Sequence, residues 1–174
     1  MSQERKSGNV IRTAGELPTE AILQQWRRER PDIDPLPMAV CGEIWRAGER
    51  LRQAVLANLS AYELDFPAFD ILLTLRRQGR GHALTPTELA REMMLPGSTM
   101  TNRLDRLEQR GLIARTADPR DRRAIHIVLS DAGTALADEI VVSHVATEER
   151  MLSELSAEDR THIRTLLARI GAPD

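Results

Sequence analysis

The sequence predicts a mainly α-helical fold that carries one small β-hairpin, and three observations support this fold class. Apolar residues recur at steps of three and four along most of the chain, as amphipathic helices require. Two such segments, within residues 84–111, are separated only by a helix breaker at residues 95–97. Two short apolar segments follow at residues 112–116 and 124–129, and the second alternates with the period of a strand.

The first half of the chain predicts three helices after an aperiodic start at residues 1–17. Thr19 is the candidate cap of a short helix, which prolines from position 31 onward bring to an end. A long helix is expected over residues 38–59, and another over residues 67–77. The apolar stripes of these helices contain Ile22, Leu23 and Trp26, then Cys41, Ile44, Gly48, Leu51 and Val55, and finally Phe69, Leu72, Leu73 and Leu75.

The paired helices before the hairpin carry strong local signals. Thr85 and Glu88 form a capping box around Pro86, which predicts a helix that begins there. Gly111 can adopt the left-handed conformation that ends the next helix. The sequence therefore predicts a helix, a tight turn, a second helix and then the hairpin.

Two further helices are expected after the hairpin. Ser130 and Asp131 predict the start of a helix of about twenty residues. Ser156 and Asp159 form a looser capping box, which predicts the start of the last helix.

The second helix of the pair has two distinct faces. At about 100° per residue, Met100, Leu104 and Leu107 fall together and are expected to be buried. The opposite face carries hydroxyl, amide and guanidinium groups, which are suited to base edges and phosphates. With the basic hairpin tip beside it, this helix predicts a DNA-reading segment. The residues expected to contact DNA are Ser98, Thr99, Thr101, Asn102 and Arg106 of the helix, and Arg120, Arg122 and Arg123 of the hairpin tip.

The distribution of charge is compatible with this interpretation, although the formal net charge of the chain is -2. Residues 98–123 contain seven arginines and four acidic residues, a net charge of +3. Residues 131–174 contain nine acidic residues and four arginines, a net charge of -5. Phosphate attraction is local in cellular salt, so a basic edge on an acidic body can bind DNA. The alternative is a protein-interaction module that uses the same surface.

The segment resembles the MarR (multiple antibiotic resistance regulator) family of bacterial regulators in Ser98-Thr99, Arg106-Leu107-Glu108, Gly111-Leu112-Ile113 and Asp121-x-Arg123-x-x-x-Ile127-x-Leu129-Ser130. The resemblance covers residues 38–170. It implies a winged helix-turn-helix homodimer that binds a palindromic double-stranded DNA operator, usually as a repressor.

The resemblance also implies a division of the chain. Residues 1–35 would be an extension with a short helix, and residues 36–174 a MarR-type domain. Within that domain, residues 61–130 would form the winged helix-turn-helix. In the family the first and last helices of two chains interlock, so residues 36–60 and 131–174 would form the dimer interface. The apolar stripes in these helices agree with that expectation.

Arg103 stands where the family usually has an apolar residue. It lies about 70° from the core stripe, so it is expected to lean toward the body of the protein. A partly buried guanidinium needs an anionic partner or several acceptors. Asp70 is the first candidate for that partner and Asp65 the second.

Four residues are similar to those of the urate-responsive subgroup of this family: Trp26, Asp70, Arg91 and Arg103. That resemblance implies a small-molecule effector, a purine or phenolic anion, that stacks on the tryptophan and pairs with the arginines. It would break the aspartate–arginine ion pair and shift the DNA-reading helix. The alternative is that Arg103 forms a purely structural ion pair and that Trp26 is a packing residue.

The single cysteine, Cys41, excludes an internal disulfide and agrees with a cytoplasmic location. A redox-sensing regulator that uses this thiol is an alternative function. Because Cys41 lies on an apolar stripe without a nearby cation, a core thiol is the expected state.

Other classes of protein are disfavoured. The histidines lack metal-binding spacing, so neither a metal site nor a cofactor is predicted. The sequence has no phosphate-binding glycine loop and no clear pairing of nucleophile and base, so an enzyme is not expected. No apolar run approaches the length of a membrane span, and the polar start is unlike a signal peptide.

Overall fold

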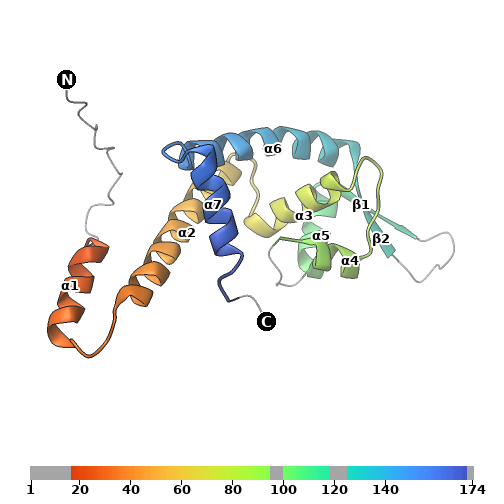
Figure 1. Cartoon of the computed structure of the whole chain (residues 1–174). Coiled ribbons are helices and arrows are strands. Elements are labelled where there is room, and N and C mark those ends of the chain that lie inside the picture. Colours follow the sequence, from red (N-terminus) through yellow and green to blue (C-terminus); the bar gives the residue numbers. More distant parts are fainter. Residues whose placement is uncertain (1–16, 95–99, 118–124, 172–174) are drawn as a thin grey trace, which may run out of the picture. The chain divides into compact units, whose positions relative to one another are not determined.

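A computed structural model of the chain describes residues 17–94, 100–117 and 125–171 (Figure 1). The predicted fold class is confirmed, because the described residues form helices and one antiparallel pair of strands. The elements in chain order are α1 (Thr19–Glu29), α2 (Leu36–Ser60), α3 (Phe66–Arg77), α4 (Pro86–Glu92), α5 (Met100–Gln109), β1 (Ile113–Ala117), β2 (Ile125–Leu129), α6 (Asp131–Met151) and α7 (Ala157–Leu167).

The chain divides into two compact units. One unit contains the residues up to Arg52 together with those from Met151 onward, and the other runs from Gln53 to Arg150. No helix in the described ranges has both the length and the apolar character needed to cross a bilayer.

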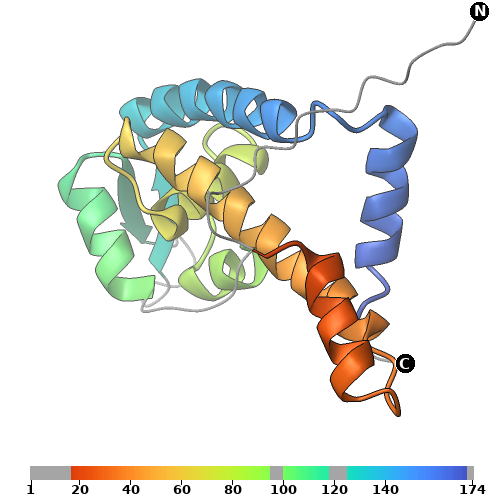
Figure 2. The same cartoon turned by 90° about the vertical axis from the view of Figure 1, so that its left-hand side faces the viewer.

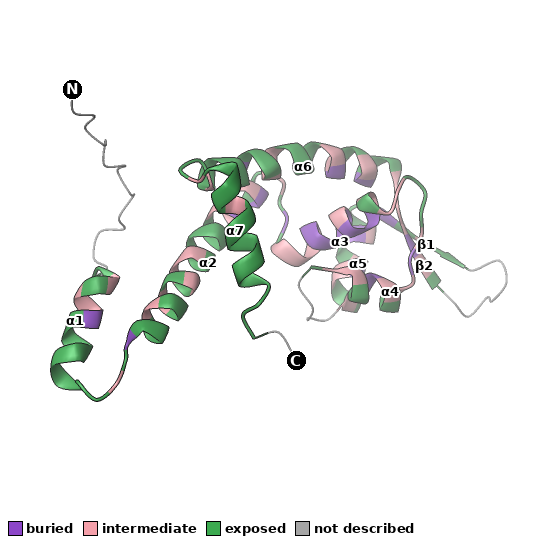
Figure 3. Cartoon of the chain, in the orientation of Figure 1, coloured by how far each residue is buried: buried purple, intermediate pink, exposed green. Residues whose placement is uncertain are grey.

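The second unit has a well-formed core centred on α3, where Figure 3 shows buried residues concentrated. The side chains that fill this core come from every element of the unit: Leu59 of α2, Ile71, Leu72 and Leu75 of α3, Leu89 of α4, Leu107 of α5, Ile113 of β1, Ile127 of β2 and Ile140 of α6. The strands pair antiparallel from Ile113 opposite Leu129, and Leu84 adds a bridge to Ile127. This core holds α5 and the base of the hairpin in one body.

Local signals set most helix starts as the sequence predicts. Both predicted capping boxes are present, at Thr85 with Glu88 and at Ser156 with Asp159. Hydrogen bonds from the backbone and hydroxyl of Thr85 lower the pKa of Glu88. Gly111 has a φ angle of 69°, the left-handed conformation expected after α5.

The first unit contains α1, α7 and most of α2. Thr19 is not the cap of α1, because that position is held by Pro18 without a side-chain hydrogen bond. The Thr19 hydroxyl instead donates to Glu43 of α2 and accepts from Arg46 at 3.0 Å. Figure 2 shows α1 beside the first part of α2, where these contacts are made.

The single chain leaves much apolar surface of this unit uncovered. Leu23 is the one buried residue of α1, and α7 has none. Cys41 is exposed, so the expectation of a core thiol is wrong for one chain. The reason is that no described element covers this part of the α2 stripe.

Candidate nucleic-acid interface and neighbouring pocket

Helix α5 separates apolar and polar residues as the helical wheel predicts. Leu104 is 2% exposed and Leu107 is 1% exposed, and Met100 packs partly against the same core. Thr101, Asn102 and Arg106 are exposed, as their expected role in binding DNA requires. Arg106 forms no ion pair within the described part of the chain, so its guanidinium is available to a phosphate or a base edge.

The remaining predicted DNA-contacting residues, Ser98, Thr99, Arg120, Arg122 and Arg123, lie outside the described residues.

Strand β1 contributes an arginine to which the sequence analysis gave no role. Arg115 donates to Asp105 at 2.6 Å and to Glu108 at 2.5 Å, and both carboxylates lie on α5. The hydrogen bond to Asp105 and the charges of both acids raise the pKa of Arg115, while burial opposes this change. Acidic residues at positions i and i+3 share a helix face. The sequence shows that the two acidic residues are three positions apart, but it does not show which cation forms ion pairs with them.

A pocket of about 400 Å³ lies along another side of α5. Its polar wall brings two arginines of α5, and a third directly after this helix, close to two acidic residues that precede α3. The pocket is lined by Glu63, Asp65, Ala68, Arg103, Arg106, Leu107, Gln109 and Arg110. Such a wall can hold a small anion, because arginines are among the residues that line this partly enclosed space.

The ion pair of Arg103 in this pocket is with Asp65, at 2.7 Å. The preferred partner in the sequence analysis was Asp70, so the order of the two candidates is reversed. Asp65 is the N-cap of α3, where it accepts from the backbone of Ala68 and keeps a half-exposed side chain within reach of α5. Arg103 itself is 23% exposed, as its position beside the core stripe predicts.

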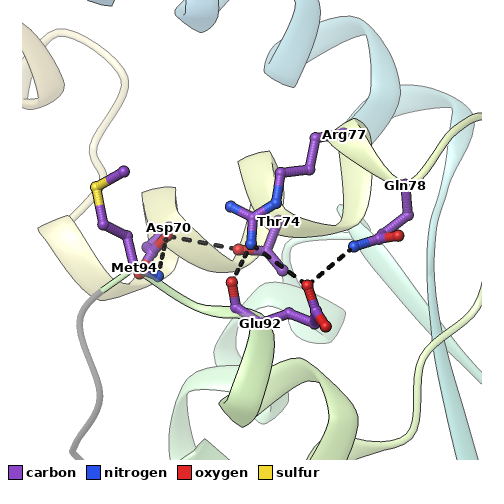
Figure 4. Close-up of polar contacts among 6 residues, drawn as sticks. All are labelled: Asp70, Thr74, Arg77, Gln78, Glu92 and Met94. Carbon is purple, nitrogen blue, oxygen red and sulfur yellow. Dashed lines mark hydrogen bonds and ion pairs between the residues drawn. The ribbon is translucent and has the colours of Figure 1, made fainter.

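Asp70 has a different setting, shown in Figure 4. Its carboxylate is buried and accepts from the Thr74 hydroxyl at 3.5 Å and from the backbone N–H of Met94 at 3.4 Å. Arg77 donates to the backbone carbonyl of Glu92, and Gln78 donates to the carboxylate of Glu92 at 3.4 Å. Helix α3 therefore holds the end of α4, which precedes α5 in the chain.

The four residues expected to bind an effector have different settings. Arg103 lines the pocket, whereas Asp70 and Arg91 of the same unit are not among its lining residues. Arg91 is exposed on α4. Trp26 belongs to the other unit, and it is 39% exposed.

The structure offers no metal centre in the ranges that it describes, because no three histidine, cysteine or acidic residues there gather around one point.

Comparison with known proteins gives consistent matches. The family model described as "MarR family" matches residues 62–124. The transcriptional regulator PecS of Dickeya dadantii is 44% identical over 154 residues, which cover 88% of this chain and 93% of PecS. The transcriptional repressor MdtR of Bacillus subtilis is 36% identical over 107 residues, covering 60% of this chain and 67% of MdtR.

Solved structures agree with these matches. One is BpsR of Bordetella bronchiseptica, whose DNA binding is regulated by 6-hydroxynicotinic acid. Its structure is similar to this one with a TM-score of 0.68 and 26% identity, over 78% of this chain and 94% of BpsR.

Proposed function

The chain belongs to the MarR family of transcriptional regulators, and from this premise we propose that it is a cytoplasmic repressor. The proposed repressor binds a palindromic operator as a homodimer. It releases the operator when a small aromatic anion binds. The family consists of transcriptional regulators and not of enzymes, so the chain is not an enzyme.

The observation that best supports operator binding is the amphipathic character of α5. Leu104 and Leu107 anchor one face in the core, while Thr101, Asn102 and Arg106 project from the other. An anchored helix with exposed amide and guanidinium groups is suited to the major groove, where such groups pair with adenine and guanine. The name of the relative MdtR, a repressor, supports repression as the outcome.

A homodimer is supported by the apolar residues that the first unit leaves exposed. They include Leu36, Met38, Val40, Trp45 and Leu51 of α2, and Ile163, Leu166 and Leu167 of α7. Large apolar side chains that are exposed in such number are typical of an interaction site. We assign it to a second copy of the chain, because a palindromic operator requires a two-fold symmetric protein.

An anionic effector is supported by the pocket beside α5. Arg103 pairs there with the carboxylate of Asp65, and a ligand anion would compete with that carboxylate for the same guanidinium. Because Arg103 lies on α5, such competition would favour a different position of the DNA-reading helix. The aromatic acid that regulates BpsR is of the same chemical class as the proposed effector, for which urate and phenolic acids are the first candidates.

The test of operator binding is a gel shift with the DNA fragment upstream of the coding frame. We expect binding that weakens as salt increases, because phosphate contacts release counterions. Arg106→Ala combined with Arg123→Ala should weaken binding at least roughly ten-fold, while leaving the oligomeric state unchanged. Arg28→Ala is the matched control, since Arg28 is an exposed arginine of α1. Unchanged affinity in the double variant would contradict the proposal and favour a protein-interaction module.

The test of the effector uses tryptophan fluorescence with urate and a small panel of phenolic acids. We propose that Trp26 stacks on the aromatic ring, so that the effector quenches its emission and releases DNA. Trp26→Phe should abolish the quenching, and Arg103→Ala should abolish the release. Trp45→Phe is the control, because Trp45 is the other tryptophan of the chain. If both variants respond like the parent protein, the proposed effector site is wrong.

A further inference from the structure

The DNA-facing side of α5 carries an electrostatic conflict. Asp105 follows the exposed Asn102 by three residues, and its side chain is 44% exposed. Glu108 lies one further turn along the same face, with a side chain that is 38% exposed. Two uncompensated carboxylates beside groups that approach phosphates would repel the DNA backbone.

Arg115 resolves this conflict from the neighbouring strand. One guanidinium nitrogen donates to Asp105 at 2.6 Å and another to Glu108 at 2.5 Å. The arginine side chain is 28% exposed, so it is held between β1 and α5 and does not extend freely into solvent. Charge-assisted hydrogen bonds of this geometry fix both partners, and the guanidinium offsets one of the two negative charges.

The same contact sets the position of the hairpin. Arg115 lies two residues before Ala117, where β1 ends and the basic tip at residues 118–123 begins. The ion pairs of Arg115 with α5 therefore fix the distance between this helix and the base of the hairpin. Partly exposed ion pairs contribute little to folding stability, so the main effect of this contact is expected on DNA binding.

We propose that Arg115 is a positioning residue for DNA binding, which offsets part of the negative charge of Asp105 and Glu108 and holds the hairpin against the DNA-reading helix without itself touching DNA. This proposal rests on the proposed function, because it presupposes that α5 faces the operator.

The test compares full-length variants by fluorescence anisotropy with the same upstream DNA fragment. Arg115→Met removes both ion pairs and leaves the two carboxylates uncompensated. We expect its affinity to fall roughly ten-fold, the scale of one or two charge interactions. The triple variant Arg115→Met, Asp105→Ala, Glu108→Ala should recover most of that loss, because the repelling carboxylates are gone.

A matched control is Arg76→Met, which breaks the ion pair of 2.5 Å between α3 and Asp138 of α6. The exposure of that pair is similar, but it does not involve α5. It should change the melting temperature about as much as Arg115→Met does while leaving DNA affinity at the parent value.

Two results would overturn the proposal. One is a triple variant that stays as weak as Arg115→Met, with a salt dependence shallower by about one counterion, since that identifies a direct phosphate contact. The other is equal loss of affinity in Arg115→Met and Arg76→Met, which would show a general effect on folding. If the parent protein does not bind the fragment at all, the proposed function fails and not only the role of Arg115.

Discussion

Asp65 uses its two carboxylate oxygens for different purposes. One oxygen accepts from the backbone of Ala68 at 2.8 Å and caps α3, and the other pairs with Arg103 at 2.7 Å. A single residue therefore joins the start of a core helix to the DNA-reading helix. Different substitutions of Asp65 can therefore remove its charge alone or its charge together with its capping hydrogen bond.

Asp65→Asn should retain the cap and weaken only the charge interaction with Arg103. Asp65→Ala should lose both, and its free energy of unfolding should fall by about 1 kcal/mol, as for other lost N-caps. Urea denaturation measures this difference. Both variants should bind urate more tightly than the parent protein in calorimetry, because the competing carboxylate is removed. Weaker urate binding in both would show that Asp65 is not the competitor of the effector.

At the scale of elements, the hairpin and α6 are joined through a close backbone approach. Ser130 donates through its backbone to the carbonyl of Leu112 at 3.1 Å and through its hydroxyl to that of Gly111 at 2.6 Å. A Cβ atom at Gly133 would lie 1.8 Å from the Leu112 carbonyl oxygen. Only glycine allows α6 to begin so near to β1.

Gly133→Ala is therefore expected to destabilise the protein, against the helix propensity of alanine. Propensity alone would add about 1 kcal/mol to the free energy of unfolding. The clash with a backbone atom should reverse the sign and cost about 1–3 kcal/mol, as overpacking does. Thermal and urea denaturation measure the change, and Ala135→Gly on an exposed position of α6 calibrates the propensity effect. A more stable Gly133→Ala variant would contradict the close approach.

At the scale of the whole molecule, the uneven burial of apolar residues separates the two units. The second unit buries a continuous core, whereas α7 buries none of its residues and Trp45 of α2 is 75% exposed. Burial of such surface against a second chain is the physical reason to expect a dimer, since exposed apolar area is costly in water.

Trp45→Glu should shift the protein from dimer to monomer and weaken operator binding, because a buried charge at an apolar interface is costly. Analytical ultracentrifugation measures the oligomeric state, and Arg28→Glu controls for an acidic residue at an exposed polar position of the same unit. A Trp45→Glu protein that remains a dimer would place the interface elsewhere.

The sequence by itself determined the local structure of the chain. Capping residues such as Thr85 and Ser156 placed helix starts, and the spacing of Leu104 and Leu107 placed the buried face of α5. These features depend on contacts within a few residues, so periodicity and hydrogen-bonding capacity suffice to predict them.

Only the tertiary structure decided which charges meet. It pairs Arg103 with Asp65 in preference to Asp70, and Arg115 with the acidic residues of α5. Thr19 contacts α2 and does not cap its own helix. Ion pairs between elements depend on how those elements pack, and several carboxylates in the sequence satisfy the same chemical need. The faces of each helix are therefore fixed locally, while the partners of its charged residues are fixed by the core that holds the helices together.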